Sequence, residues 1–278
     1  MIEVPGFPVV RVRHPGPHVR LEELPHGVMR LVLTRPEVRN AFDAAMICEI
    51  SGALGALLHA ELGAELRVLL LQGEGGTFCA GGDLAYMKAQ AEATPEENLD
   101  DARALGRMFH RLASIPVPVL CHVQGAAVGG GLGLAACSDY VLADATAVFA
   151  TSEVRLGLVP GLISPYVVRR LGVAHAAPLL LTGRRVTATE ALGLGLVQCV
   201  LGPAEAAGEA LAGLLREFLA AGPAAARRTK GLLLEVSPLP DPELCEFTAR
   251  AIAEARASEE GQEGLRAFFA KVPPRWLP

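Results

Sequence analysis

Residues 67–84 read RVLLLQGEGGTFCAGGDL, a continuous apolar run that ends in a loop of small residues and closes on an aspartate. The apolar part, residues 67–73, is typical of a strand in a sheet that is covered on both faces. Asp83 follows the last glycines and is a residue type that often begins a helix. We therefore expect a buried strand, a tight glycine loop and a helix in immediate succession.

A second stretch has the same design. Residues 120–134 read LCHVQGAAVGGGLGL, again a buried strand, a small-residue turn and the start of a helix. At each helix N-terminus, backbone N–H groups lack intrahelical partners and are backed by the positive end of the helix dipole. Two such loops meeting at one point would bind a partial negative charge, as an oxyanion hole does. Close packing of helix on strand explains glycine runs equally well, so the loops alone leave both interpretations open.

Composition restricts the class of protein. The chain has 278 residues, of which 51% are hydrophobic and 20% charged, so we expect a sizeable buried core. A net charge of −5 argues against a general nucleic-acid binder. The longest apolar region, residues 117–149, is broken by polar residues and glycines, so we expect no membrane span. The six cysteines form no CxxC pair and no secretory signal is evident, which predicts reduced thiols in a cytoplasmic protein.

Common signatures of other enzyme classes do not fit this chain. The glycine loops match neither GxxxxGK[ST] nor a clean GxGxxG pattern. The GxSxG and HExxH motifs and paired Cys–His metal spacings are also absent from the sequence. We therefore expect neither a metal site nor a redox cofactor.

The pattern of elements changes along the chain. Residues 1–25 are rich in proline with little periodicity, and we expect an irregular lead-in. Residues 26–203 alternate strand and helix patterns, which predicts an α/β core. Residues 204–278 form the third part, which we expect to be all-helical. The helical patterns there cover residues 204–221, 223–235, 242–256 and 258–270.

Six segments occur in one order along the chain. They are RPEVRNAFD (35–43), TFCAGGDL (77–84), VQGAAVGGGLGLAACSDYVLAD (123–144), SEVRLGLVPGLISPYVVRRLG (152–172), TGRRVTATEALGLGLV (182–197) and EGLRAFFAKVPPRW (263–276). Together they resemble the enoyl-CoA hydratase/isomerase (crotonase) superfamily, from about residue 28 to the C-terminus. The resemblance implies a ββα spiral core and a C-terminal all-helical region that packs trimers, often paired into hexamers. It also implies an acyl-CoA thioester as substrate, with no further cofactor.

The resemblance also implies roles for single residues. Gly82 and Gly130 match the family's pair of oxyanion N–H donors, and Glu153 matches one of its catalytic glutamates. The positions that match CoA-binding positions of the family are Arg39, Ala41, Ala80, Phe268 and Lys271. In relatives, the last two reach the CoA of a neighbouring subunit. Without the resemblance, Glu153 and the other charged residues of this set would be assigned to the solvated surface, and Phe268 to the core.

One position departs from the family pattern. Gly133 stands where well-known hydratases of the family carry a second glutamate. A single carboxyl group in an apolar pocket should have a raised pKa and can take and return a proton. That suits an EC 4.2.1-type lyase that adds water to an enoyl-CoA with Glu153 as acid and base. Δ3,Δ2-enoyl-CoA isomerisation, thioester hydrolysis, decarboxylation and a non-catalytic acyl-CoA-binding role stay open.

A finer resemblance concerns the substrate. The segments CAGGDLAYMK (79–88), ENLDDARAL (97–105) and SEVRLGLVPGLISPYVVRRLG (152–172) resemble the bacterial 3-methylglutaconyl-CoA hydratase group of leucine degradation and its isohexenylglutaconyl-CoA relatives. That group is similar in having a glycine in place of the first glutamate. Such a substrate carries a distal carboxylate, which should meet a cation. Lys88, Arg155 and Arg169 are the candidates, and each is equally typical of a solvated surface charge.

Overall fold

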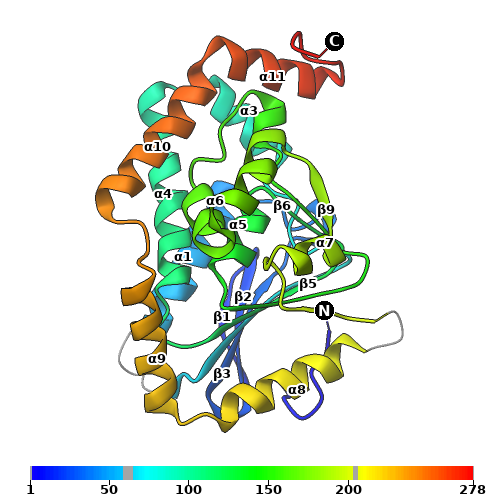
Figure 1. Cartoon of the computed structure of the whole chain (residues 1–278), viewed down its shortest axis with the longest axis vertical. Helices are drawn as coiled ribbons and strands as arrows, with labels where there is room; N and C mark the ends of the chain where they lie inside the picture. Colours follow the sequence, from blue (N-terminus) through cyan, green and yellow to red (C-terminus); the bar gives the residue numbers. More distant parts are fainter. Residues whose placement is uncertain (1, 59–64, 203–205, 278) are drawn as a thin grey trace.

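The central element is a seven-stranded sheet, found in a computed structural model that describes residues 2–58, 65–202 and 206–277 (Figure 1). In sheet order its strands are β1 (Arg11–Pro15), β2 (Val19–Leu24), β3 (Val28–Leu33), β4 (Val68–Gly73), β5 (Val119–Val123), β7 (Tyr140–Ala143) and β10 (Cys199–Val200). The strands from β3 to β10 are parallel, and β1 and β2 extend the sheet antiparallel at one edge. The fully buried β4 and β5 confirm the two strands predicted before the glycine loops.

The first two strands correct one prediction. We expected residues 1–25 to be irregular, but β1 pairs with β2, and β2 pairs with β3 over six residues. The strand pattern of β2 is hidden in the sequence because Glu22, a polar residue, is buried there. Its carboxylate pairs with Arg30 on β3, and each of these side chains is only 3% exposed. A buried ion pair of this kind is formed across the sheet, so the sequence around one partner does not reveal it.

A second, smaller layer makes the spiral. Within the described residues it is a three-stranded sheet of β6 (Ala126–Val128), β8 (Val148–Ala150) and β9 (Arg185–Thr187). Single bridges from Phe42 to Gly82 and from Cys79 to Ala127 extend this layer to the earlier turns of the chain. Each turn therefore runs from the large sheet to the small layer and then into a helix, which confirms the predicted ββα architecture.

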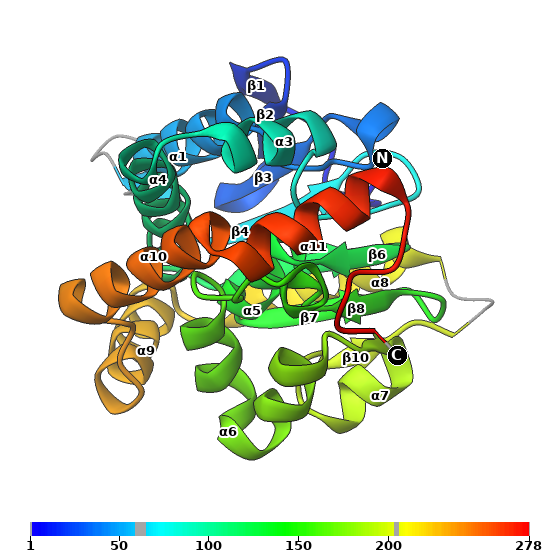
Figure 2. The same ribbon diagram turned by 90° about the horizontal axis from the view of Figure 1, so that it is seen from above.

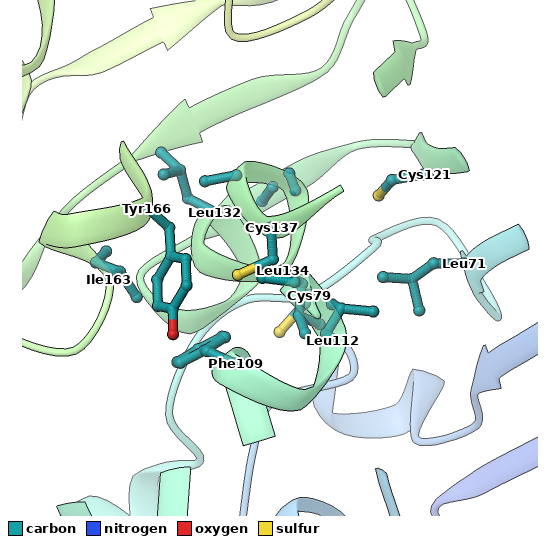
Figure 3. Packing of buried hydrophobic residues seen from close by; sticks show 14 of the residues in the cluster. Leu71, Cys79, Phe109, Leu112, Cys121, Leu132, Leu134, Cys137, Ile163 and Tyr166 are labelled. Carbon is teal, nitrogen blue, oxygen red and sulfur yellow. The ribbon is translucent and has the colours of Figure 1, made fainter. Parts of the chain in front are cut away.

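The helices of the core follow the strands. Their bounds are α1 (Ala44–Leu58), α3 (Leu84–Glu92), α4 (Pro95–Ala113), α5 (Gly130–Cys137), α6 (Ser164–Thr182) and α7 (Ala188–Gly193), with short 3-10 turns η1 (Pro25–Gly27), η2 (Pro36–Val38) and η3 (Glu153–Leu156). Helix α5 is almost wholly buried, and its small residues let α4 and α6 pack against it. Figure 3 shows side chains of this core, with Phe109, Ile163 and Tyr166 packed beside α5.

The C-terminal region is helical, as predicted, with α8 (Ala207–Ala220), α9 (Pro223–Val236), α10 (Pro242–Ala257) and α11 (Glu259–Ala270). Helix α10 lies along α4, and α11 contacts α3 and η3, so the end of the chain returns over the glycine loops (Figure 2). The predicted boundary between residues 203 and 204 lies outside the described residues. In the part of the chain that is described, no helix is both long and apolar enough to cross a membrane.

Candidate active site

The two glycine loops are tied together by backbone hydrogen bonds. The Cys79 N–H donates to the Ala126 carbonyl at 3.0 Å, and the Val128 N–H donates to the Cys79 carbonyl at 3.0 Å. On its other side, the first loop is bonded to the segment before α1, because the Phe42 N–H donates to Gly81 O at 2.7 Å. These bonds place the starts of α3 and α5 side by side. The two glycine loops therefore meet at one point, which the sequence alone did not decide.

Two backbone N–H groups are free at this point. Gly82 lies just before α3, and Gly130 is the first residue of α5, where a helix has no intrahelical partner for its N–H. Neither N–H donates a hydrogen bond to any residue within the described ranges. Gly129, which caps α5, has φ 52° and ψ −119°, a conformation that favours glycine. The loops therefore form the predicted pair of unpartnered donors.

Glu153 lies beside both loops. A Cβ atom built on Gly129 would be 3.3 Å from Glu153 Oε1 and 3.9 Å from the Cα atom of Gly81. Glu153 begins η3, and its carbonyl accepts a hydrogen bond from the Leu158 N–H at 3.0 Å, which closes the turn. The chain thus brings one carboxyl group to the point where the two glycine loops meet.

The Glu153 carboxyl group is in an unusual state. Its Oε2 atom is buried and has no hydrogen-bond partner in the part of the chain that the structure describes. Burial raises the pKa of Glu153 to about 7, and a backbone hydrogen bond acts in the opposite direction. Close to neutral pH the group is therefore divided between the acid and the carboxylate, as a group that takes and returns a proton must be.

The position of Gly133 is closed by apolar side chains. A Cβ atom there would lie 2.5 Å from Ile163 Cγ2 and 2.9 Å from two carbons of the Phe109 ring. Even an alanine would force these neighbours to move, and a glutamate side chain would have no room. Because Phe109 and Ile163 also line the cavity described below, the cavity wall is hydrocarbon where the family pattern has a second carboxyl group.

A cavity of about 950 Å³ lies over the loops and connects the predicted site residues. Those that line it are Arg39, Ala41, Ala80, Gly82, Gly130, Glu153 and Phe268. Phe268 lies on α11, so in this chain it reaches the cavity of its own fold. Lys271 ends α11 as an exposed residue with φ 57°, between the lining residues Phe268 and Val272 in sequence.

The candidate cations separate into two groups. Of the described residues proposed for a distal carboxylate, Arg155 lines the cavity, and Lys88 and Arg169 lie outside it. Arg169 Nε donates to the Ser237 carbonyl at 2.7 Å. The cavity also contains a cation that sequence reasoning missed, Arg256 on α10. Nothing local in the sequence reveals it, because α10 reaches the cavity only by folding back along α4.

Arg35 was also missed, although it begins one of the recognised segments. Its Nη1 donates to the Ala41 carbonyl at 2.6 Å and pairs with Asp43 at 3.0 Å. Its Nη2 donates to Asp83 at 3.1 Å, and the Asp83 carboxylate in turn accepts from the N–H of Ala85, at the start of α3. One guanidinium therefore fixes both sides of the loop that carries Gly82.

A ββα spiral that aims two free N–H groups and a buried carboxyl group at one cavity defines a class of proteins that bind a substrate oxygen through the backbone. The chain belongs to the enoyl-CoA hydratase/isomerase family, whose sequence profile matches residues 23–277. The family resemblance of the six sequence segments is thereby confirmed.

Solved structures and curated relatives agree with this membership. The crystal structure of an enoyl-CoA hydratase from Shewanella pealeana is 39% identical, with 93% of this chain and 96% of that chain covered and a TM-score of 0.73. Pseudomonas aeruginosa AtuE is 38% identical, with 94% and 100% covered and a TM-score of 0.75. The human enoyl-CoA hydratase domain-containing protein 2, mitochondrial, is 32% identical, with 90% of this chain and 86% of the human protein covered.

Proposed function

We propose that this protein catalyses syn addition of water to an enoyl-CoA thioester, with Glu153 as both acid and base. The observation that carries the proposal is the unpartnered Oε2 of Glu153, buried beside the free N–H groups of Gly82 and Gly130. An acidic group of this kind would destabilise a purely structural protein, since burial disfavours its charged form. The names of relatives, which include several enoyl-CoA hydratases, support the same reaction.

The proposed mechanism moves one proton in a closed cycle. The thioester oxygen accepts hydrogen bonds from the N–H groups of Gly82 and Gly130. The Glu153 carboxylate takes a proton from water as the water oxygen bonds to C3, and the electron pair of the double bond moves onto the thioester oxygen as an enolate. Glu153 then gives the proton to C2, which restores the carboxylate and the thioester. Each oxyanion donor of this kind typically contributes about 2.7–4 kcal/mol to transition-state stabilisation.

The remaining parts of the cavity suit the CoA portion of the substrate. Under this proposal, Arg39, Ala41, Ala80 and Phe268 contact CoA, and Lys271 adds a cation at the end of α11. The chemistry calls for no cofactor beyond the thioester. We expect a cytoplasmic enzyme, as the reduced thiols suggest.

The C-terminal helices support the proposed assembly into trimers or hexamers. Leu232 and Val236 on α9 are 61% and 71% exposed, and Phe247 on α10 is 67% exposed. Large apolar side chains this exposed on neighbouring helices are typical of a surface that contacts another subunit. We therefore keep the oligomerisation role of residues 204–278 as part of the proposal.

Isomerisation of a 3-enoyl-CoA is the second candidate, and the closed position at Gly133 favours it. An isomerase needs one base that moves a proton from C2 to C4 along a single face. The hydrocarbon wall of Phe109 and Ile163 would protect the enolate from water. The two reactions share Glu153 and the oxyanion donors but differ in whether water is added, so an assay with both kinds of substrate distinguishes them.

A spectrophotometric assay at the enoyl-thioester absorbance tests the proposal. We would compare 3-methylglutaconyl-CoA, crotonyl-CoA and a 3-enoyl-CoA in parallel. Loss of signal from 3-methylglutaconyl-CoA, faster than from crotonyl-CoA, would support hydration of the branched glutaconyl substrate proposed from the finer resemblance. Gain of signal from the 3-enoyl-CoA alone would replace the proposal with an isomerase.

A further inference from the structure

Arg256 is a mostly buried cation on the wall of an otherwise largely apolar cavity. Its side chain is 12% exposed, and it lies in the last turn of α10. Its Nη1 donates to the Asp101 carboxylate at 3.0 Å and approaches Asn98 Oδ1 at 3.4 Å, both on α4. Its Nε and Nη2 donate to none of the residues that the structure describes. One edge of the guanidinium is therefore anchored, and the other is available to a ligand in the cavity.

The anchor of Arg256 is itself held in place. The Tyr86 hydroxyl on α3 donates to the other oxygen of Asp101, and Asp101 is 11% exposed. Gln262 Nε2 donates to the Arg256 carbonyl at 2.9 Å and to the Ala91 carbonyl at 2.9 Å, which joins α11 to the end of α3. Because α3, α4, α10 and α11 all contribute, the guanidinium has a fixed orientation before any ligand arrives.

A second polar group on the same wall lacks a partner. Gln90, one turn after Tyr86 on α3, lines the cavity, and its Oε1 is buried with no hydrogen-bond partner among the described residues. Helix α3 begins at Leu84, two residues after Gly82, and rises about 9 Å from Leu84 to Gln90, at 1.5 Å per residue. Arg256 is linked to this helix through Asp101 and Tyr86, so it lies away from the oxyanion donors along α3, on the scale of a short acyl chain. The unpartnered Oε1 of Gln90 only accepts hydrogen bonds, so Arg256 is the group of this set that suits an anion.

We propose that Arg256 binds a carboxylate at the distal end of the acyl group and so selects dicarboxylic acyl-CoA substrates over simple fatty acyl-CoA substrates. The inference rests on the proposed acyl-CoA function of the cavity. A guanidinium presents parallel N–H donors that match the two oxygens of a carboxylate. Asp101 leaves the Nε and Nη2 edge of the guanidinium open, because its contact is with Nη1. The other oxygen of Asp101 accepts a hydrogen bond from the Tyr86 hydroxyl.

Arg155 is the competing cation for this role. It also lines the cavity, but it is the exposed residue of η3, and its Nε donates to the Thr182 carbonyl at 3.1 Å. Arg256 is more deeply buried and is held by a surrounding set of side chains. A phosphate group of CoA is the other anion that Arg256 would suit, and the experiment below separates these cases.

Binding of unreactive esters tests the proposal without catalysis. We would titrate glutaryl-CoA, butyryl-CoA and free CoA into the wild type and the double variant Arg256→Met/Asp101→Asn. The double variant leaves no buried charge unpaired, and the amide oxygen introduced on α4 can still accept from Tyr86. We expect glutaryl-CoA to bind roughly 10- to 100-fold more weakly to the double variant, as for loss of a charged hydrogen bond, and the other two ligands to change by no more than about twofold.

Matched variants complete the test. Arg250→Met removes an arginine from the same helix that is 56% exposed and pairs with Glu246, and it should change no affinity. Equal weakening of all three ligands would assign Arg256 to CoA or to folding and overturn the proposal. The proposal would also be overturned if Arg155→Met selectively lost glutaryl-CoA binding while the Arg256→Met/Asp101→Asn variant kept it. The hydration assay tests the proposed function separately from this binding test. Selective binding of glutaryl-CoA through Arg256, without hydration of any enoyl-CoA, would support this inference and reject the proposed reaction.

Discussion

Ile163 fills the space beside Gly133: a Cβ atom on this glycine would lie 2.5 Å from Ile163 Cγ2. Phe109 closes the same space from α4, at 2.9 Å. The missing glutamate is therefore not a vacancy in the site but a position occupied by packed hydrocarbon. The proposed catalysis therefore relies on the carboxyl group of Glu153.

Replacement of Gly133 by alanine should destabilise the fold. The added methyl group overlaps Ile163 and Phe109, and overpacking of a core typically costs about 1–3 kcal/mol. Urea unfolding of Gly133→Ala would measure this loss. In the double variant with Ile163→Ala, the methyl group gains room, so the two changes should destabilise by less than the sum of the single changes. Strictly additive effects would contradict the contact.

Hydration should depend on pH through one ionisation. The pKa of Glu153 is raised to about 7 by burial, and the proposed base is the carboxylate. We expect kcat/KM to rise as the pH rises through about 7 and then to level off. In Glu153→Gln, the rate should fall roughly 100- to 10,000-fold, the usual contribution of a general acid or base. The same rise through pH 7 in Glu153→Gln would place the proton transfer on another residue.

The same carboxyl group should make folding stability depend on pH. Its pKa in the folded state, about 7, lies above the value of 4.5 for an unperturbed glutamate, so the folded protein binds the proton more tightly. The stabilisation is full below pH 4.5 and is lost as the pH rises through 7. Glu153→Gln lacks this loss, so we expect it to match the wild type at pH 5 and to exceed it by about 2–3 kcal/mol at pH 8.5. Denaturant unfolding at the two pH values would show the difference, and an equal difference at both would contradict it.

Arg35 should act on catalysis through position alone. It joins Ala41, Asp43 and Asp83 around the loop of Gly82 and reaches no reacting atom in the proposed mechanism. In Arg35→Met, we expect kcat to fall about 10- to 100-fold, because a displaced donor loses part of its oxyanion stabilisation. KM should change little. Kinetics of hydration would test this, with Arg35→Lys restoring part of kcat if charge matters as well as geometry.

The glycine loops were predictable because their design is local. An apolar strand, a run of small residues and a capping aspartate follow one another directly, and the Asp83 carboxylate accepts from the N–H groups of Ala85 and Tyr86. The C-terminal helices were predictable for the same reason. The strands within residues 1–25 were not, because β2 carries Glu22 inside the sheet, where only its partner Arg30 on another strand makes that burial favourable.

The candidate site was predicted in part. Gly82, Gly130 and Glu153 lie in recognised segments, and the structure brings them to one cavity with the other predicted lining residues. Arg35 lies in such a segment too, but its role depends on three partners up to 48 residues away. Arg256 lies in no segment that resembled the family, and its role depends on α10 folding along α4.

By itself, the sequence determined the order of strands, glycine loops and helices from about residue 26 onward, because periodicity and turn residues act within short stretches of chain. The identity of the carboxyl group that the proposed chemistry requires came from the resemblance of residues 152–172 to the enoyl-CoA hydratase/isomerase family. The tertiary structure decided what surrounds that carboxyl group: Gly129 beside Oε1, hydrocarbon at Gly133, and Arg256 on the cavity wall. Each of these depends on contacts between segments far apart in the chain, and burial by such contacts is what raises the pKa of Glu153.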